Sequence, residues 1–423
     1  MALDLANEVV IRWNDPDPRH VPLLQEGGIT VSWGSAEEEF RRACAAAGIE
    51  SAPVGALRAV SLEDLGPATA GEPAVVTWGV WPGVQGRDAD VASATRSIWL
   101  DANLFRVACL RALHPGAPPV LAYLPDTDAG VSPERLLPFE SLELALVEAW
   151  AAGGNYVLAV EPRYREALLR GDEKALSAWR SLGRTARWLR AHSGLFRQPP
   201  LPNVTVLVDQ GDVSHEIANL MFRQSVSPAV EPASNPPPPD PSARRVLVAF
   251  GIDAPAPAIA DRVLAHATAG ATVVVDDTSE KAWWRRGRFK LVKSQEDRDF
   301  FAAGKGQVVA YHQVGDPGEF ALDVLDLVTR DRRPATLWNS VAAIPVAAKG
   351  PETGSVAGRA VLHVVNYGRP QDLPVLARVQ GNFERATLLR PESAPQDIPV
   401  AKRGINSEVK LPDLARFATV VFR

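Results

Sequence analysis

Residues 141–196 decide the fold of this chain, and they read SLELALVEAWAAGGNYVLAVEPRYREALLRGDEKALSAWRSLGRTARWLRAHSGLF. The first part carries apolar residues at helical spacing up to Trp150, after which Gly153 and Gly154 end the predicted helix. The apolar run 156–160 predicts a buried strand, and a second long helix follows it. We interpret residues 156–160 as the closing strand of a parallel β/α barrel, with accessory domains after it.

The residues before this stretch alternate between short β-type runs and amphipathic helices. Strands are predicted at 9–13, 29–33, 49–54, 57–60, 74–78 and 120–124, and helices at 36–47 and 103–113. Strands that alternate with helices form parallel sheets. Residues 1–200 are therefore predicted to form a TIM-like β/α barrel. The strand count up to residue 160 is six or seven, which leaves open whether the barrel has all eight strands.

A second and a third domain are predicted after the barrel. Residues 201–332 alternate again between strands (204–208, 246–250, 271–275, 307–311) and helices (214–223 with Ser214 as its cap, 259–269, 297–303, 319–329), which predicts a Rossmann/flavodoxin-like α/β domain. The proline-rich residues 228–241 predict an extended polyproline loop. Short alternating runs at 361–365, 375–379, 386–389 and 419–422 predict a C-terminal all-β sandwich over 333–423.

The composition narrows the class of function. Of the 423 residues, 46% are hydrophobic and 22% are charged, as in ordinary globular proteins. The net charge of -5 argues against nucleic acid or an anionic membrane as partner, because both require a positive surface. No apolar run approaches the roughly 20 residues that span a bilayer, and residues 1–7 lack the features of a signal peptide. We expect a soluble protein, cytoplasmic as given or secreted with its leader removed.

Neither the cysteines nor the histidines predict a metal centre. Cys44 and Cys109 each lie in a predicted amphipathic helix, where a free thiol acts as a small core side chain. Two cysteines are too few for a disulfide framework or a Cys-type zinc site. None of the seven histidines stands at metal-ligand spacing from another histidine or from a cysteine. We therefore predict no bound metal.

Several phrases of the sequence carry a family resemblance. They are EAWAAGGNYVLAVEP, SLGRTARWLRAHSGLF leading to NVTVLVD, AIADRVLAHATAGATVVVDD, and the ending HVVNYGRP, ATLLRPE and VKLPDLARFATVVF. In these phrases and in the order of its parts, the chain resembles glycosidase-like proteins such as the β-galactosidases of glycoside hydrolase family 42. The resemblance covers nearly the whole chain. It implies a barrel, a flavodoxin-like domain, a C-terminal β domain and a carbohydrate as ligand.

The catalytic motifs of that family are less evident than its architecture. The resemblance would place a proton donor after an Asn at the end of the fourth strand, and a nucleophilic Glu at the end of the seventh. The Asn-Glu pair Asn7-Glu8 comes too early to serve as the first motif. If residues 156–160 are the eighth strand, the seventh is 120–124, and no Glu follows it directly.

Carboxyl groups after the predicted strands are the candidates for catalysis. Glycoside hydrolysis requires two carboxyls on opposite sides of the anomeric carbon, and barrel active sites lie at the carboxyl ends of the strands. The eligible residues are Asp15, Asp17, Asp126, Asp128 and Glu161. We select Asp126 and Glu161 as the catalytic pair, since they follow adjacent strands. The alternative is that Asp126 and Asp128 cap a turn and Glu161 caps the next helix.

Tryptophans are concentrated in the first hundred residues, several of them at predicted strand ends. A flat indole face packs well on the C–H groups of a sugar ring, and tryptophans also fill barrel cores. The five are Trp13, Trp33, Trp78, Trp81 and Trp99. We expect two or three of them to lie in the core, with Trp81 and Trp99 facing the ligand. The predicted substrate-binding residues are Trp13, Trp33, Trp81, Trp99, Asp101 and Asn103.

The Rossmann/flavodoxin-like domain is predicted to bind no cofactor. It has no Cys for a glutamine amidotransferase, no P-loop, and only Gly304-Lys305-Gly306, which precedes a strand, in place of a dinucleotide motif. We expect a structural or subunit-contact role for this domain, as in a homo-oligomer. The segment 281–293, KAWWRRGRFKLVK, mixes basic and aromatic residues and is expected to form a solvated loop with one Trp buried.

The sequence supports two possible functions, one catalytic and one non-catalytic. The first is a glycoside hydrolase acting on a β-linked sugar through carboxylates at the barrel mouth. The second is a non-catalytic relative that keeps the fold for carbohydrate binding or assembly. We rank the enzyme slightly ahead.

Overall fold

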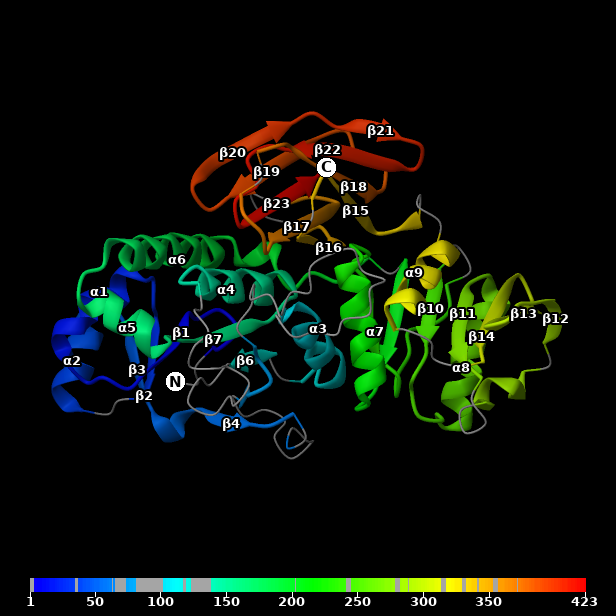
Figure 1. Cartoon of the computed structure of the whole chain (residues 1–423), viewed down its shortest axis with the longest axis horizontal. Coiled ribbons are helices and arrows are strands. Elements are labelled where there is room, and N and C mark those ends of the chain that lie inside the picture. The colour runs from blue at the N-terminus through cyan, green and yellow to red at the C-terminus, as the bar shows by residue number, and fades with distance from the viewer. Residues whose placement is uncertain are drawn as a thin grey trace.

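The computed structural model describes the greater part of the chain. The described residues are 4–34, 37–62, 64, 74–80, 102–116, 119–122, 138–201, 203–240, 245–277, 282–287, 289–312, 317–328, 332–340, 342–352, 357–370 and 372–423. They form a mixed α/β fold with two sheets that contain parallel strands and two antiparallel sheets. In Figure 1 the N-terminal and the middle part of the chain lie side by side, and the C-terminal strands lie across both.

The N-terminal strands form one parallel sheet. They are β1 (Val10–Trp13), β2 (Val31–Gly34), β3 (Glu50–Pro53), β4 (Arg58–Val60), β5 (Ala74–Val76), β6 (Val120–Ala122) and β7 (Asn155–Ala159). Their order in space is β3-β2-β1-β7-β6-β5-β4, which is the cyclic order of a barrel opened between β3 and β4. β7 pairs with both β6 and β1, with Ile11 opposite Leu158. The run 156–160 therefore joins the first strand to the later ones, as predicted for a closing strand.

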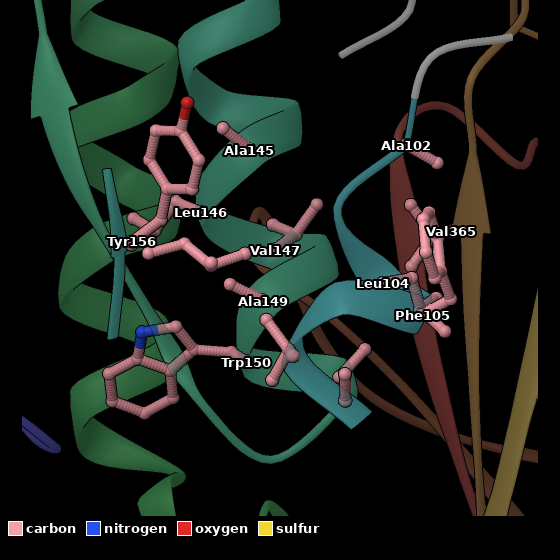
Figure 2. Close-up of a cluster of buried hydrophobic side chains, with 14 of the residues drawn as sticks. Ala102, Leu104, Phe105, Ala145, Leu146, Val147, Ala149, Trp150, Tyr156 and Val365 are labelled. Atoms are coloured by element: carbon pink, nitrogen blue, oxygen red, sulfur yellow. The ribbon is translucent and has the colours of Figure 1, made fainter. Parts of the chain in front are cut away.

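Helices cover the outer face of this sheet. They are α1 (Val21–Glu26), α2 (Glu38–Ala46), α3 (Leu104–Leu113), α4 (Ser141–Ala151), α5 (Pro162–Leu169) and α6 (Glu173–Ala191). Every residue of α4 is buried, because it has the β7 side of the sheet on one side, α3 and α6 beside it, and the C-terminal strand β17 (Ala360–Asn366) across it. Figure 2 shows Leu146, Trp150 and Tyr156 of this core, together with Phe105 and Val365, which belong to the same buried cluster.

The middle sheet combines parallel and antiparallel strands. They are β8 (Val204–Val208), β9 (Ala229–Pro232), β10 (Val246–Ala249), β11 (Thr272–Asp276), β12 (Lys290–Ser294), β13 (Arg298–Ala303) and β14 (Gly306–Tyr311). The spatial order is β12-β13-β14-β11-β10-β8-β9, and the five strands from β14 to β9 are parallel. Helices α7 (Asp212–Arg223), α8 (Pro257–Ala269) and α9 (Pro317–Val328) belong to this part.

Three local predictions in the middle part were wrong. A helix was predicted at 297–303, but residues 298–303 form strand β13. Phe300 packs with the core shared with the N-terminal sheet, whereas Phe301 packs on the opposite side, near Trp284. Only a strand sends neighbouring side chains to opposite faces. Residues 229–232, inside the predicted polyproline loop, form edge strand β9, where a proline is tolerated. Helix α7 begins at Asp212 after Gly211, so Ser214 lies within the helix.

The basic and aromatic segment 281–293 also differs from its prediction. Trp283 and Trp284 are both buried, on a short 3-10 helix (Ala282–Arg286), in place of one buried Trp in a solvated loop. β12 follows and pairs with β13. Both indoles belong to the buried cluster that also contains Val275 of β11 and Ala310 of β14, and burial of two rings offsets the cost of ordering the segment.

The C-terminal strands form two facing antiparallel sheets. One contains β15 (Ala335–Trp338), β18 (Val375–Gln380), β22 (Asn406–Leu411) and β21 (Ala401–Arg403), and the other contains β16 (Ala343–Lys349), β17, β23 (Phe417–Phe422), β19 (Ala386–Arg390) and β20 (Ser393–Ile398). Leu362, Val379 and Phe422 pack between the two sheets. The opposite face of β17 and β23, including Val365 and Phe417, packs on the helices of the N-terminal part.

No helix in the described part of the chain has the length and apolarity needed to cross a membrane.

Candidate functional site

The candidate site lies where β1 and β7 end, because ligands of parallel β/α sheets bind outside the carboxyl ends of the strands. Here the structure has a crevice with a volume of about 240 Å³. Its lining comes from the end of β1, the end of β7 and the first turns of α5. The lining residues are Arg12, Trp13, Asn14, Ala159, Val160, Pro162, Arg165 and Glu166.

Strand register brings Arg12 to the inner face of the sheet. Val10 packs with Val31 and Val157 inside the sheet, while Ile11 faces the helices, so alternation turns Arg12 inward. In register, Arg12 lies between Ala159 of β7 and Trp33 of β2, and Trp33 is followed by Ala52 of β3. Of this row, Arg12 and Ala159 line the crevice, and Trp33 and Ala52 pack in the core inside the sheet.

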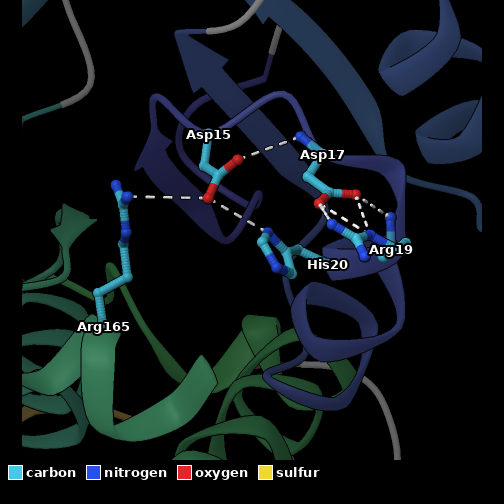
Figure 3. A network of polar contacts seen from close by, with 5 residues as sticks. All are labelled: Asp15, Asp17, Arg19, His20 and Arg165. Atoms are coloured by element: carbon cyan, nitrogen blue, oxygen red, sulfur yellow. Dashed lines mark hydrogen bonds and ion pairs between the residues drawn. The ribbon is translucent and has the colours of Figure 1, made fainter. Parts of the chain in front are cut away.

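The loop after β1 carries two aspartates, and Figure 3 shows Asp15 in contact with Arg165, which lines the crevice. Asp15 Oδ2 lies 3.7 Å from Arg165 Nη2 and 3.3 Å from His20 Nδ1, and Asp15 Oδ1 accepts a hydrogen bond from the Asp17 backbone N–H at 3.2 Å. Asp17 accepts hydrogen bonds from the backbone and the guanidinium of Arg19, with Oδ2 2.6 Å from Nη2. The Arg19 hydrogen bonds lower the pKa of Asp17 to about 2. Asp17 is thus ionised at neutral pH and cannot act as a general acid.

Glu161 follows β7 and caps α5. Its Oε2 accepts a hydrogen bond from the Tyr164 backbone N–H at 3.1 Å, which is the capping role given above as the alternative to catalysis. Asp126, its predicted catalytic partner, and Asp128 lie outside the described residues. The catalytic pair Asp126 and Glu161 therefore stays a prediction.

The predicted aromatic platform is only partly described. Trp81, Trp99 and Asp101 lie outside the described residues. Trp13 is 1% exposed, with its ring edge-on to His20 and 6.0 Å from the Arg165 guanidinium, so it supports the wall of the crevice. Trp33 is 6% exposed and packs inside the sheet. Both were predicted to bind substrate, but both indoles are buried, because they fill the space beside and inside the sheet.

Asn103 lies in the protein interior instead of at the crevice. Its amide oxygen accepts a hydrogen bond from the Val80 N–H at 2.7 Å, and its Nδ2 donates to Val80 O and to Glu148 Oε1. Both functional groups of the amide are thus engaged within the protein. Asn103 was predicted to bind substrate; its observed role is to join the start of α3 to the segment after β5 and to α4.

Sequence reasoning missed Glu148, which is fully buried on α4. Its carboxylate accepts hydrogen bonds from Asn103 N at 2.9 Å, Asn103 Nδ2 at 2.6 Å and Tyr367 Oη at 2.6 Å. Burial raises the pKa of Glu148 to about 7, although these hydrogen bonds oppose the rise. The sequence did contain a signal for this buried carboxyl group. α4 is apolar on most of its faces, so an acidic residue within it is buried and needs hydrogen-bond partners.

Among the described residues no group of three His, Cys, Asp or Glu side chains could hold a metal ion. Cys44 and Cys109 are buried free thiols, and burial raises the pKa of each. Neither thiol is a ready nucleophile, because the thiolate is the reactive form.

The sequence matches no family model and no curated protein. Solved structures match in fold. A catalytic mutant of Gan42B, a GH42 β-galactosidase from G. stearothermophilus, superposes with a TM-score of 0.53 at 12% identity, over 91% of this chain and 65% of that chain. The β-galactosidase from Rahnella sp. R3 superposes with a TM-score of 0.51 at 12% sequence identity, over 91% of this chain and 66% of that chain. The α-L-fucosidase isoenzyme 2 from Paenibacillus thiaminolyticus superposes with a TM-score of 0.51 at 11% sequence identity, over 84% of this chain and 68% of that chain.

These likenesses concern the fold, since identities this low carry no information on activity. This chain spans between 65% and 68% of the length of the three proteins. The resemblance expected from the sequence is thereby confirmed in its architecture. In fold, the chain is similar to the glycoside hydrolase family 42 β-galactosidases.

Proposed function

We propose that this chain binds a carbohydrate in the crevice at the carboxyl ends of β1 and β7. The observation that carries the proposal is the lining of that crevice. Arg12, Asn14 and Arg165 offer hydrogen-bond donors, and Glu166 offers acceptors. Sugar hydroxyls both donate and accept, and the apolar side chains of Val160 and Pro162 suit the C–H groups of a sugar ring.

Binding without hydrolysis is supported by the carboxylates beside the crevice. Hydrolysis requires two carboxyls about 5 to 10 Å apart that act on the substrate. Asp15 pairs with Arg165 and His20, Asp17 with Arg19, and Glu161 caps α5. Each of these three carboxylates therefore already has a structural task within the chain.

Hydrolysis is the second candidate, favoured by the place of Glu161. Glu161 comes two residues after Ala159, the last residue of β7, and so lies at the carboxyl end of the closing strand, where the active sites of barrels are built. In this candidate Glu161 is the nucleophile and Asp126 the proton donor.

We further propose three domains, at 1–200, 201–332 and 333–423. Numbered along the chain, the five parallel strands of the middle part have the order 2-1-3-4-5, which supports a flavodoxin-like domain. We assign it a structural or subunit-contact role in a homo-oligomer, without a cofactor. Light scattering on the full chain tests this assignment, and a strictly monomeric protein would exclude the subunit-contact role.

Titration calorimetry with oligosaccharides selected on a glycan array tests carbohydrate binding. Arg165→Ala should weaken binding about tenfold or more, because it removes a charged hydrogen-bond donor from the crevice. Arg163→Ala is the matched control, since Arg163 is exposed on the same helix and does not line the crevice. Equal effects of the two variants, or no glycan bound, would exclude the site.

A panel of aryl β-glycosides separates the two candidates. If the chain hydrolyses any of them, Glu161→Gln and Asp126→Asn should each remove turnover while glycan binding persists. If it binds glycans and hydrolyses none, the non-catalytic function holds.

A further inference from the structure

A groove lies at the amino ends of the parallel strands in the middle sheet. Its volume is about 370 Å³, within the range of small-molecule sites. The starts of β10, β11 and β14 line it, together with Asn203 just before β8. The Asn203 amide donates a hydrogen bond to Gln380 of β18, so the groove lies where the middle sheet meets the C-terminal sheets. Ligand sites occur preferentially at such junctions.

Three basic residues, each from a different segment, belong to the lining of this groove. Arg245 precedes β10, Lys305 lies in the turn between β13 and β14, and Arg332 follows α9. Arg245 Nη2 lies 2.7 Å from Asp240 Oδ2, which neutralises the charge of this arginine. The side chains of Lys305 and Arg332 make no hydrogen bond or ion pair within the described part of the chain, and the lining found there contains no acidic residue. Two uncompensated positive charges therefore remain.

The turn that carries Lys305 is fixed against α8. The Lys305 backbone N–H donates to the carbonyl oxygen of Thr268 at 3.1 Å. Gly304, the other residue of the turn, has a φ of 59° and lies so close to Thr268 that a Cβ would overlap it. The backbone of Lys305 is thus held at one place on the groove, and a fixed position reduces the entropy lost when a ligand binds.

The helix ends beside the groove do not account for both cations. α8 ends at Ala269, next to the lining residue Gly270, and α9 ends at Val328, which lines the groove. The carboxyl end of a helix carries about half a negative charge. Two full positive charges exceed these two partial charges, so the groove keeps a positive potential in a chain with a net charge of -5.

We propose that this groove binds a compact anion with at least two negative charges, of the diphosphate type. Lys305 and Arg332 would each hold one of its charged groups. Lysine binds phosphate as a point charge and arginine binds it through the planar guanidinium fork, so both side chains suit this chemistry. Leu327 and Val328 offer an apolar wall to an organic part of the ligand, as in a nucleotide. The site is independent of the crevice at β1 and β7.

Titration calorimetry on the full chain with pyrophosphate tests the site, with orthophosphate and ADP as comparison ligands. Pyrophosphate should bind more tightly than orthophosphate, because its two groups engage both cations. Lys305→Gln and Arg332→Gln should each weaken pyrophosphate binding about threefold to tenfold, since charges that are partly exposed contribute less than buried ones. The double variant should weaken it about tenfold to a hundredfold, the product of the two effects.

ADP separates two sources of the same chemistry. ADP binding tighter than that of pyrophosphate would identify a nucleotide as the ligand, with its organic part on Leu327 and Val328. ADP binding weaker than that of pyrophosphate would identify a free polyphosphate. Both results support the diphosphate site.

Lys174→Gln and Arg170→Gln are the matched controls, because each removes the same charge from an exposed position outside the groove. Both should change the affinity by less than about twofold. Lys305→Arg keeps the charge and should also stay within about twofold, which separates the loss of charge from a change of fold. The proposal is overturned if pyrophosphate gives no saturable heat, if orthophosphate binds as tightly, or if the control variants weaken binding as much as Lys305→Gln and Arg332→Gln.

Discussion

Tyr367 Oη lies 2.6 Å from Glu148 Oε2, and both side chains are buried. Tyr367 follows β17 of the C-terminal sheets, and Glu148 lies on α4 of the N-terminal part. This hydrogen bond therefore crosses the interface on which the C-terminal sheets pack. Asn103 completes the cluster from the start of α3.

Tyr367→Phe should destabilise the protein by about 1 to 3 kcal/mol, because the buried carboxylate of Glu148 loses a donor that nothing replaces. Urea unfolding followed by circular dichroism measures the loss. Tyr164→Phe is the matched control, since the Tyr164 hydroxyl makes a longer bond, 3.4 Å, to the neutral carbonyl of Ala175. An equal loss in both variants would show that the charge of Glu148 plays no part.

The raised pKa of Glu148 predicts a pH-dependent contribution to stability. The folded state holds its proton up to about pH 7, against a reference pKa of 4.5, so this contribution is fully present below about pH 4.5 and is lost as the pH rises through 7. The unfolding free energy of the wild type should therefore fall by about 3 kcal/mol relative to that of Glu148→Gln between pH 4 and pH 8, because only the wild type loses this proton. Denaturation at several pH values measures it, and a constant difference would contradict the prediction.

The pKa values of two histidines should be shifted in opposite directions from the ordinary value. His363 is buried between Thr419 Oγ1 and Leu195 O, and burial lowers its pKa to about 4. Its contribution to stability is present above pH 6.5 and is lost as the pH falls through 4. A hydrogen bond to Asp299 raises the pKa of His312, whose Nε2 lies 3.1 Å from Oδ2.

NMR titration of the two rings measures both shifts. The His363 signals should stay constant down to about pH 5, while the His312 midpoint should lie above the ordinary value. Asp299→Asn should lower the His312 midpoint and leave His363 unchanged. Protonation of His363 near pH 6.5 would contradict the structure.

Gly183→Ala should destabilise the protein by about 1 to 3 kcal/mol. A Cβ at Gly183 would overlap the carbonyl oxygen of Glu26, where α6 crosses the end of α1, and backbone cannot move aside as a flexible side chain can. Thermal unfolding measures the loss. Gly194→Ala is the control, since nothing lies within 4 Å of a Cβ there, and a comparable loss in both variants would rule out the overlap as the cause.

The sequence predicted where the candidate site lies, but not which residues line it. Loops after strands were expected to carry it, and the crevice does lie after β1 and β7. Arg12 and Arg165 were not predicted, because neither belongs to a motif and only strand register and the start of α5 bring them together.

The sequence by itself determined the order of the elements and the class of each part. Apolar periodicity marks β7, α4 and α6 unambiguously, since a buried strand and a long amphipathic helix each impose their own repeat. Tertiary structure decided the cases where local preference is weak. Residues 298–303 became a strand because Phe300 and Phe301 must enter two different cores, and Glu148 could be buried only because Asn103 and Tyr367 approach it from distant positions. Such contacts are made between segments far apart in the chain, so no local pattern records them.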